Sequence, residues 1–233
     1  MASSTSIILG TISNGLWLFV LIPQLYTNYQ LKRTDSISMS LIISWIYGDI
    51  LVIISGYLKH SNQMVIFGSV FHIMLILLLG SQVLYYRNLN KKGENTNLDV
   101  SEQRYIASVI GSLILFFPFI KAFPDVMADV LGWFALSLFV MSRIPQIILN
   151  YTRKSTEGLS VTSFVLINVS NYISLASILV DVHTYSQFLE NIQWIVGPFF
   201  TTILDIIMLN ASGYAHIEND VDTENDVENL FKV

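Results

Sequence analysis

The chain has 233 residues, of which 53% are hydrophobic and only 12% are charged, and its mean hydropathy is +0.58. Because a soluble globular domain carries about 25% charged residues, this composition argues against a soluble domain and favours a protein that crosses a membrane several times. The formal net charge of -5 is not the signature of a nucleic-acid-binding protein, and the lack of cysteine excludes disulfides and thiolate metal sites.

Long apolar stretches predict seven membrane-spanning helices. The first 31 residues carry no Asp, Glu, Lys or Arg, and they lack the basic start and the cleavage site of a secretory signal, so we interpret them as the first span. We expect the spans near residues 6–29, 40–58, 63–86, 104–121, 127–150, 160–180 and 191–213. The segment 87–103 is a polar linker, and the acidic tail 214–233 is expected to be disordered and cytosolic.

The basic residues predict the orientation in the membrane. The side that holds the loops after spans one, three and five is rich in Lys and Arg: Lys32, Arg33, Arg87, Lys91, Lys92, Arg104, Arg153 and Lys154. The opposite loops hold only Lys59 and Lys121. We therefore expect the C-terminus in the cytosol and the N-terminus on the other, luminal side.

One segment of the first span recurs in the fifth at an offset of 122 residues. Both copies, 22–38 and 144–160, read Ile-Pro-Gln and then carry Asn-Tyr, Lys, Thr, an acidic residue and Ser at matching positions. A repeat of this kind divides the chain into two three-helix units, 1–86 and 127–213, with a polar linker and an inverting helix within 87–126. The predicted fold is an all-α membrane protein of two parallel three-helix bundles joined by a linker helix.

The repeated segment predicts a kink in each half. Pro23 and Pro145 each remove a backbone hydrogen bond inside a span. In lipid the freed carbonyl needs a partner, and the amides of Gln24 and Gln146, directly after each proline, are suitable partners. One interpretation is a purely structural kink; the recurrence in register favours a hinge that bends as a cytosolic gate opens.

These motifs resemble those of the PQ-loop family of seven-span membrane proteins. The resemblance rests on "SRIPQIILNYTRKSTEGLS" at 142–160, "SWIYGD" at 44–49 and "WIVGPFFTTILD" at 194–205, and it covers roughly residues 10–212. Within the family the chain is most similar to the lysosomal and fungal vacuolar exporters of cationic amino acids. The resemblance implies a multi-pass protein of the vacuolar or lysosomal membrane.

Three charged residues fall inside predicted spans and away from the first and last three residues of each span. A charge at the centre of a span costs about 2.5–3.5 kcal/mol on the insertion scale. The three residues are Asp49, Arg143 and Asp205. A deep carboxyl group can take up a proton from an acidic lumen and release it to the cytosol, or it can bind a cationic substrate. The alternative for each aspartate is a structural partner for Arg143 or for a neighbouring Asn or Tyr. For Arg143 we expect an aliphatic stem that extends to the interface; the alternative is an ion pair at the gate with one of the two aspartates.

Asp49 of the first repeat aligns with Asn171 of the second, so symmetry-related positions offer a carboxylate and a neutral amide. We expect these two residues at the core of a substrate and proton site, together with Asp205, Asn168 and Tyr172. Asn168 and Asn171 share a helix face, and a polar contact between helices is the alternative for them. His72, in the middle of the third span, could relay protons, but a lone histidine is more often a hydrogen-bonded packing residue.

The sequence contains no phosphate loop, nucleophile motif or spaced metal ligands, so we expect neither an enzyme nor a cofactor. We hypothesise a proton-coupled transporter that exports Arg, Lys or His from the lumen to the cytosol by alternating access. Its partners would be a basic amino acid, protons and the lipid bilayer. Two alternatives stay open: a carrier of another small solute, such as cystine or a sugar, and a membrane receptor or scaffold that does not transport.

Overall fold

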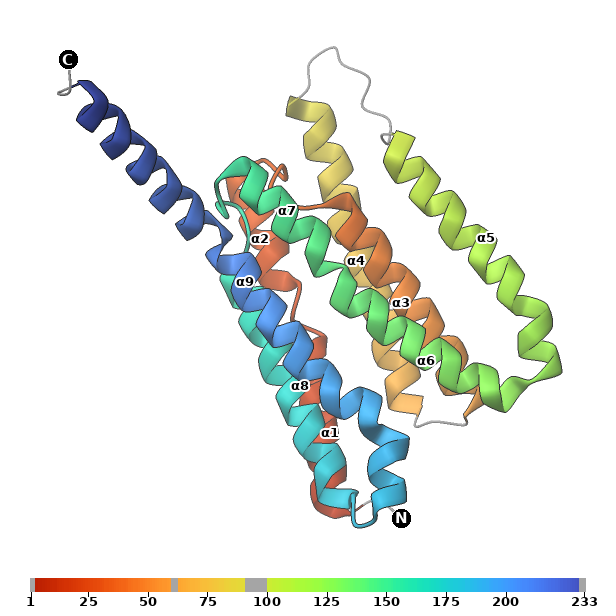
Figure 1. Ribbon diagram of the computed structural model, residues 1–233. Coiled ribbons are helices and arrows are strands. Elements are labelled where there is room, and N and C mark those ends of the chain that lie inside the picture. The colour runs from red at the N-terminus through yellow and green to blue at the C-terminus, as the bar shows by residue number, and fades with distance from the viewer. Residues whose placement is uncertain (1–2, 60–62, 91–99, 231–233) are drawn as a thin grey trace.

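The computed structural model describes residues 3–59, 63–90 and 100–230, except for the side chains of residues 63–65, 190 and 211–230. Over these residues the chain forms helices and no β-strand, which confirms the all-α fold class (Figure 1). The helices are α1 (Ser4–Trp17), α2 (Ile22–Leu31), α3 (Met39–Leu58), α4 (Gln63–Asn90), α5 (Val100–Ala122), α6 (Pro124–Met141), α7 (Arg143–Arg153), α8 (Val161–Asp181) and α9 (Tyr185–Leu230).

Seven segments of the described chain are long and apolar enough to cross a membrane, which confirms the predicted number. They are Ser4–Leu31, Met39–Leu58, Ile66–Asn90, Val100–Ala122, Pro124–Arg153, Val161–Asp181 and Asn191–Asn210. The first span combines α1 with α2, and the fifth combines α6 with α7. The sequence predicts an irregular tail from residue 214, but the backbone of α9 continues as a helix to Leu230. The side chains of residues 211–230 lie outside the described part of the chain, so the disorder of this tail stays a prediction.

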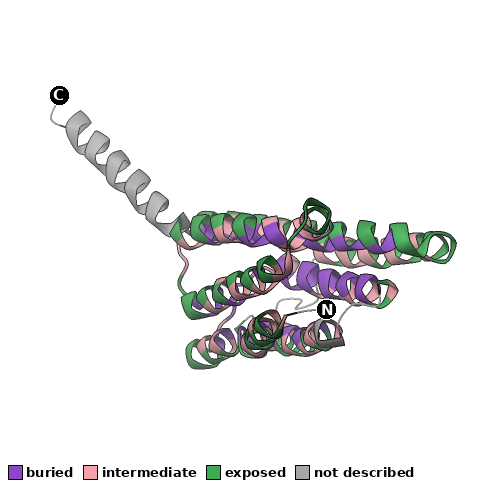
Figure 2. Ribbon diagram, turned by 90° about the horizontal axis from the view of Figure 1, so that it is seen from below, coloured by how far each residue is buried: buried purple, intermediate pink, exposed green. Residues whose placement is uncertain are grey.

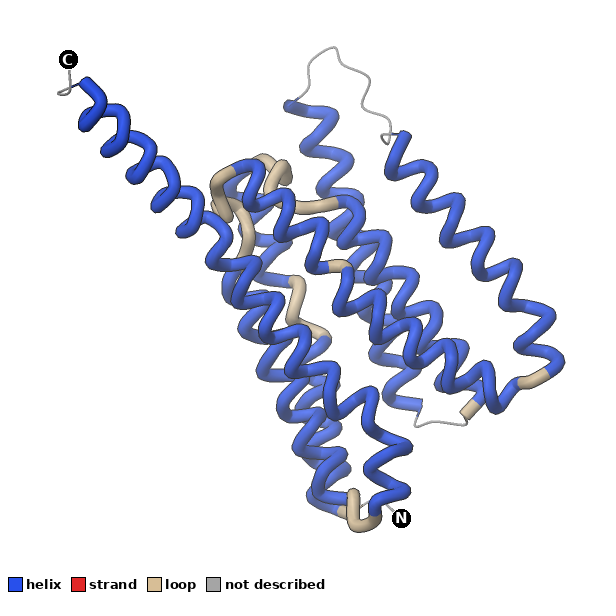
Figure 3. Tube along the Cα trace, in the orientation of Figure 1, coloured by secondary structure: helices blue, strands red, loops and turns tan. Residues whose placement is uncertain are grey.

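Both proline-containing spans are interrupted close to the proline, as the loop-coloured breaks in Figure 3 show. α1 ends at Trp17 and α2 begins at Ile22, so Pro23 lies in the first turn of α2, where a missing N–H leaves no bond unmade. In the fifth span only Ser142 separates α6 from α7, and Pro145 is the third residue of α7. The predicted kinks are present, and the first interruption is longer than the second.

The two repeats interlock, because the first helix of each repeat packs along the second helix of the other. α1 lies along α8, and α3 lies along α6. The third helices complete the bundles, with α4 against α3 and α9 against α7 and α8. The linker helix α5 packs on α3 and α6 and buries none of its residues, as expected of a helix that faces lipid (Figure 2).

Close contact between α3 and α6 depends on Gly48. A Cβ atom added at Gly48 would lie 2.7 Å from Cε1 of Phe139, a side chain of α6 that packs against both apolar clusters of the core. The absence of a side chain at this position allows the two helices to approach where the repeats meet.

We predict that Gly48→Ala destabilises the protein, because Phe139 would have to move out of a packed interface; overpacking of this kind costs about 1–3 kcal/mol. Gly111→Ala is the matched control, since a Cβ at Gly111 of α5 would have nothing within 4 Å. The thermal unfolding midpoint of each purified variant in detergent measures the effect. Equal midpoints for the two variants would contradict the importance of this contact.

Candidate functional site

A cavity of about 520 Å³ lies between the two repeats. Its wall is formed by α1, α3 and α4 on one side and by α6, α7, α8 and α9 on the other. It extends from Ser6 and Ser177, near the ends of α1 and α8, to Trp45 and Arg143 deep in the bundle. We call the face with Ser6 the N-terminal side, and the face with the loops 32–38 and 154–160 the PQ side. The volume is in the range of small-molecule sites.

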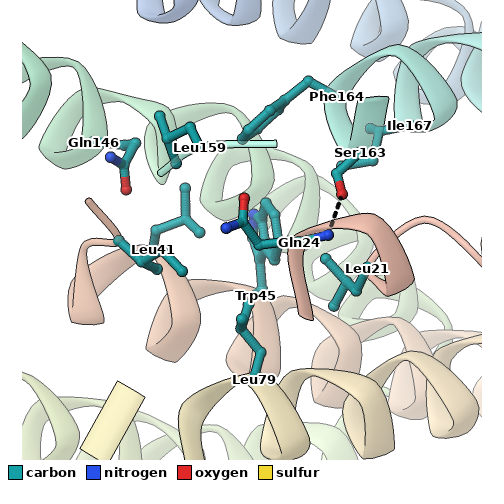
Figure 4. A pocket seen from close by; sticks show the side chains of 11 residues that line it. Leu21, Gln24, Leu41, Trp45, Leu79, Gln146, Leu159, Ser163, Phe164 and Ile167 are labelled. Carbon is teal, nitrogen blue, oxygen red and sulfur yellow. Dashed lines mark hydrogen bonds between the residues drawn. The ribbon is translucent and has the colours of Figure 1, made fainter. Parts of the chain in front are cut away.

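On the PQ side the cavity gives way to a packed layer. A void of only about 20 Å³ remains there, room for about one water molecule. Figure 4 shows its lining of apolar side chains around Trp45 and Gln24, with Gln146 to one side. The cavity is therefore closed toward the PQ side by side-chain packing.

The glutamine of the first repeat binds the loop of the second repeat. Nε2 of Gln24 donates to the carbonyl oxygen of Gly158 at 2.8 Å, and its Oε1 accepts from the N–H of Ser160 at 2.7 Å. The backbone N–H of Gln24 also donates to Oγ of Ser163 at 3.1 Å, the bond drawn in Figure 4. Nε2 also donates to Oδ1 of Asn28, one turn further along α2, at 2.9 Å. The expectation that this amide would satisfy the carbonyl freed by the proline is wrong, because both of its atoms bind these other groups.

Gln146 makes the equivalent contacts in the opposite direction. Its Nε2 donates to the carbonyl oxygen of Ser36 at 2.7 Å, and its Oε1 accepts from the N–H of Ser38 at 2.8 Å. Ser36 and Ser38 stand 122 residues before Gly158 and Ser160, so the two glutamines obey the same repeat offset as the motif. We refer to these two sets of contacts as the glutamine clamps. They join the repeats at the closed end of the cavity.

Asp49 lies in the cavity wall and pairs with His72. Oδ2 of Asp49 is 2.8 Å from Nδ1 of His72, and the side chains are 5% and 8% exposed. The imidazole is held between two indoles, Trp17 at a centroid distance of 5.2 Å and Trp45 at 5.9 Å. A carboxylate and an imidazole in direct contact form a unit that can exchange protons with a cavity. The hydrogen bond to Asp49 and the contacts with both indoles agree with a hydrogen-bonded packing residue, and a proton relay through His72 stays a prediction.

Arg143 does not extend to the interface, so the expectation of an interfacial guanidinium is wrong. Its Nε donates to Oδ1 of Asp205 at 3.0 Å, and the two side chains are 4% and 2% exposed. The guanidinium carbon also lies 5.7 Å from the centroid of the Trp45 ring. The pairing occurs because Asp205 on α9 offers a countercharge inside the bundle, which compensates the cost of burying the guanidinium.

A second polar group completes the environment of Asp205. Nδ2 of Asn168 donates to Oδ2 of Asp205 at 2.8 Å, and Oδ1 of Asn168 accepts from the hydroxyl of Thr202 at 2.5 Å. Both oxygens of this carboxylate therefore have a donor. Asp205 has the surroundings of a structural anion that fixes Arg143 in the cavity wall.

The remaining predicted residues separate into two groups. Asn171 lines the cavity together with Asp49, as the alignment of the repeats predicts. Tyr172 is 38% exposed, and its ring packs edge-on against Phe199 at 5.9 Å, outside the cavity lining. The structure thus brings Asp49, Asn171 and Arg143 to one cavity and leaves Tyr172 outside it.

Sequence reasoning missed Gln193. This residue of α9 is 4% exposed and lines the cavity. An uncharged amide near the start of a span gives a weak signal, because such residues are common at membrane boundaries. Across the residues that the structure describes, no three His, Asp or Glu side chains are grouped in a way that could hold a metal ion.

Seven spans, two interlocked repeats with one Pro-Gln segment each, and a polar cavity between them define a class of membrane protein with internal repeats. The family model for the PQ loop repeat matches residues 5–65 and 127–187. The chain belongs to the PQ-loop family.

Several characterised proteins are similar to this chain over most of its length. The vacuolar lysine transporter YPQ1 of Saccharomyces cerevisiae is 24% identical, over 89% of this chain and 92% of the transporter. The lysosomal amino acid transporter 1 homolog of Gallus gallus is 24% identical, over 87% of this chain and 78% of that protein. The vacuolar histidine transporter YPQ3 of Saccharomyces cerevisiae is 21% identical, over 88% of this chain and 90% of that protein.

We predict that Asp205→Asn is strongly destabilising. It leaves the guanidinium of Arg143 buried without a countercharge, which costs about 3–5 kcal/mol. The double variant Arg143→Met with Asp205→Leu, which removes both charges, should recover most of this loss. The thermal unfolding midpoint in detergent reports the difference.

Glu157→Gln is the control for this prediction, because Glu157 pairs with Arg33 at 2.7 Å on the exposed surface. Exposed pairs of this kind contribute about 0–1 kcal/mol. A double variant as unstable as Asp205→Asn would contradict the account of a compensated buried pair.

Proposed function

We propose that the chain is a carrier of basic amino acids that works by alternating access across the membrane of a vacuole or lysosome. The observation that carries this proposal is the cavity of about 520 Å³ between the repeats, which has the Asp49–His72 pair in its wall and is closed on the PQ side. A cavity at the interface of two repeats, closed at one end, is what alternating access requires.

The choice of substrate rests on the charge of the wall and on the relatives. Asp49 supplies a buried anion that can bind an ammonium or guanidinium group. The similar proteins are named as transporters of lysine, of histidine and of amino acids in general. A further relative, the vacuolar arginine/histidine antiporter YPQ2 of Saccharomyces cerevisiae, is 34% identical over 35% of this chain and 27% of that protein. Together these observations support arginine, lysine or histidine as cargo.

The orientation of the protein in the membrane is inferred from the positive-inside rule. The basic loops 32–38 and 154–160 belong on the cytosolic side, so the open N-terminal side of the cavity faces the lumen. In this state a basic amino acid enters from the lumen and reaches Asp49. The C-terminus is then cytosolic and the N-terminus luminal.

Proton coupling is assigned to the Asp49–His72 pair. Asp205 is unsuited to this role, because Arg143 and Asn168 both bind its ionised form. Asp49 is in direct contact with an imidazole, a group that can accept or give up a proton. Asp49 is therefore the carboxyl group that links cargo and proton.

The glutamine clamps and the prolines form the cytosolic gate. Opening toward the cytosol requires the bonds of Gln24 and Gln146 to the opposite loops to break. Pro23 and Pro145 lie next to the interruptions at residues 18–21 and 142, where the spans can bend without losing further helical bonds. The two halves then rock about these points and release the cargo.

We predict that proteoliposomes containing the protein take up radiolabelled arginine, faster under an imposed pH gradient, and that Asp49→Asn abolishes the gradient-dependent part. The physical reason is that an amide neither binds a cation strongly nor carries a proton. The initial rate of uptake with and without the gradient is the measurement.

Asp125→Asn, which changes an exposed acid at the start of α6, is the control and should transport like the unaltered protein. Uptake that persists in Asp49→Asn would keep a carrier but reject Asp49 as its centre. Uptake of cystine or glucose in place of arginine would reject a basic amino acid as the cargo and keep the carrier. Saturable arginine binding by folded protein without any uptake would reject transport in favour of a receptor.

A further inference from the structure

Two buried polar atoms in the cavity wall have no hydrogen-bond partner within the protein. Among the described residues, three buried side-chain atoms are in this condition, and two of them belong to side chains of the cavity wall: Nε2 of His72 and Oε1 of Gln193. Buried polar atoms are nearly always paired, since leaving one unpaired costs free energy. Two such atoms in one cavity indicate contact points for a ligand.

The unpaired nitrogen of His72 is a hydrogen-bond acceptor. Nδ1 of His72 faces the carboxylate of Asp49 at 2.8 Å, and a carboxylate accepts, so Nδ1 carries the proton. In the neutral ring Nε2 then has a free lone pair. The edge-on contact with Trp17 and the tilted contact with Trp45 restrict the orientation of the ring and hence the direction of this lone pair. The Asp49–His72 pair therefore presents an acceptor backed by a negative charge.

Gln193 presents a second acceptor at another depth of the cavity. Its amide sits in a notch over Gly132, where an added Cβ would lie 3.1 Å from Oε1 and 3.2 Å from Nε2. Ser55 of α3 flanks the same notch, with its Oγ 3.4 Å from that Cβ position. The missing side chain at Gly132 leaves room for the amide between α6 and α3.

The separation of the two acceptors can be read along α3. Ser55, beside Gln193, follows Asp49 by six residues, which corresponds to about 9 Å along the helix at a rise of 1.5 Å per residue. A basic amino acid carries two groups that only donate hydrogen bonds, the α-ammonium group and the cationic end of its side chain. The aliphatic part of the side chain separates them by a similar distance, between one and two helical turns.

The charges around the cavity favour one orientation of such a ligand. Lys59, the residue that follows α3, lies one turn beyond Ser55 and also lines the cavity. It pairs with the exposed carboxylate of Asp129, and this lysine places a cationic group on the Gln193 side of the cavity, where an α-carboxylate would be. Arg143, at the opposite end, is neutralised by Asp205 and leaves Asp49 as the uncompensated anion next to His72.

We propose that Gln193 and His72 set the specificity of the site by binding the two cationic groups of a basic amino acid. The amide oxygen of Gln193 accepts from the α-ammonium group, and Nε2 of His72, backed by Asp49, accepts from the side-chain ammonium or guanidinium group. This assignment rests on the proposed function for the class of substrate, and it extends that function to the residues that recognise each end.

The test measures equilibrium binding to the purified full chain in detergent, by competition against radiolabelled arginine. Three compounds separate the two ends: arginine, 5-guanidinopentanoate, which lacks the α-amino group, and citrulline, which lacks the cationic side chain. Gln193→Met should weaken arginine binding about tenfold, the effect of losing a hydrogen bond to a charged group. It should leave the affinity for 5-guanidinopentanoate unchanged within about twofold.

His72→Phe should weaken arginine and 5-guanidinopentanoate together, while the weak binding of citrulline stays the same. Gln193→Glu keeps the size of the side chain and adds negative charge, so it should strengthen arginine binding relative to 5-guanidinopentanoate. This second variant decides the role of residue 193 if Gln193→Met does not fold, as judged by thermal unfolding.

Equal weakening of arginine and 5-guanidinopentanoate by Gln193→Met would place the α-ammonium group elsewhere and overturn the assignment. No effect of either substitution on arginine would overturn it as well. Arginine binding without uptake by the unaltered protein would reject the transport function and leave this assignment standing. No arginine binding by the unaltered protein would reject the class of substrate itself.

Discussion

The need to pair backbone groups inside a membrane is the constraint on which this structure depends. The loops 32–38 and 154–160 connect consecutive spans and turn back against the bundle, and the backbone N–H and C=O groups that they bury there need partners within the protein. Gln24 and Gln146 meet this need by binding one carbonyl and one N–H each, always in the loop of the other repeat. The same bonds that satisfy the backbone hold the two repeats together on the PQ side, so opening that side must break them.

The two repeats share a scaffold and differ in charge. At the offset of 122 residues, Asp49 corresponds to Asn171 and Arg143 corresponds to Leu21. The scaffold positions, by contrast, match in detail: Lys32 and Lys154 both end their helices in the left-handed conformation, with φ values of 53° and 49°. The positions that match between the repeats form the bundle and the glutamine clamps. The positions that differ in charge make the cavity asymmetric, as a substrate with two different ends requires.

The sequence predicts the features that depend on local pattern. The seven spans follow from apolar length, and the structure has seven such segments among the described residues. The repeats follow from the Pro-Gln segments, and the family model for the PQ loop repeat matches the chain twice. The sequence alone does not predict which residues far apart in the chain become partners. Gln24 binds residues that lie 134 and 136 positions further along the chain, whereas the sequence predicts a partner within its own helix. Arg143 binds Asp205, which lies 62 positions further along, whereas the sequence predicts that its guanidinium reaches the interface. Gln193 acquires its place only through the notch at Gly132 on another helix.

The central claim is that the glutamine clamps close the cavity on the PQ side while its N-terminal side stays open, and side-specific thiol labelling tests it most directly. The chain has no cysteine, so a thiol reagent labels only a cysteine that is introduced by substitution. Ser174→Cys introduces one in the cavity wall, and Ile37→Cys introduces one in the closed layer. The account predicts that a charged reagent labels Ser174→Cys from the N-terminal side. It should label Ile37→Cys from the PQ side only after Gln24→Ala and Gln146→Ala are introduced together. Rapid labelling of Ile37→Cys with both glutamines in place, or continued protection without them, would contradict the account.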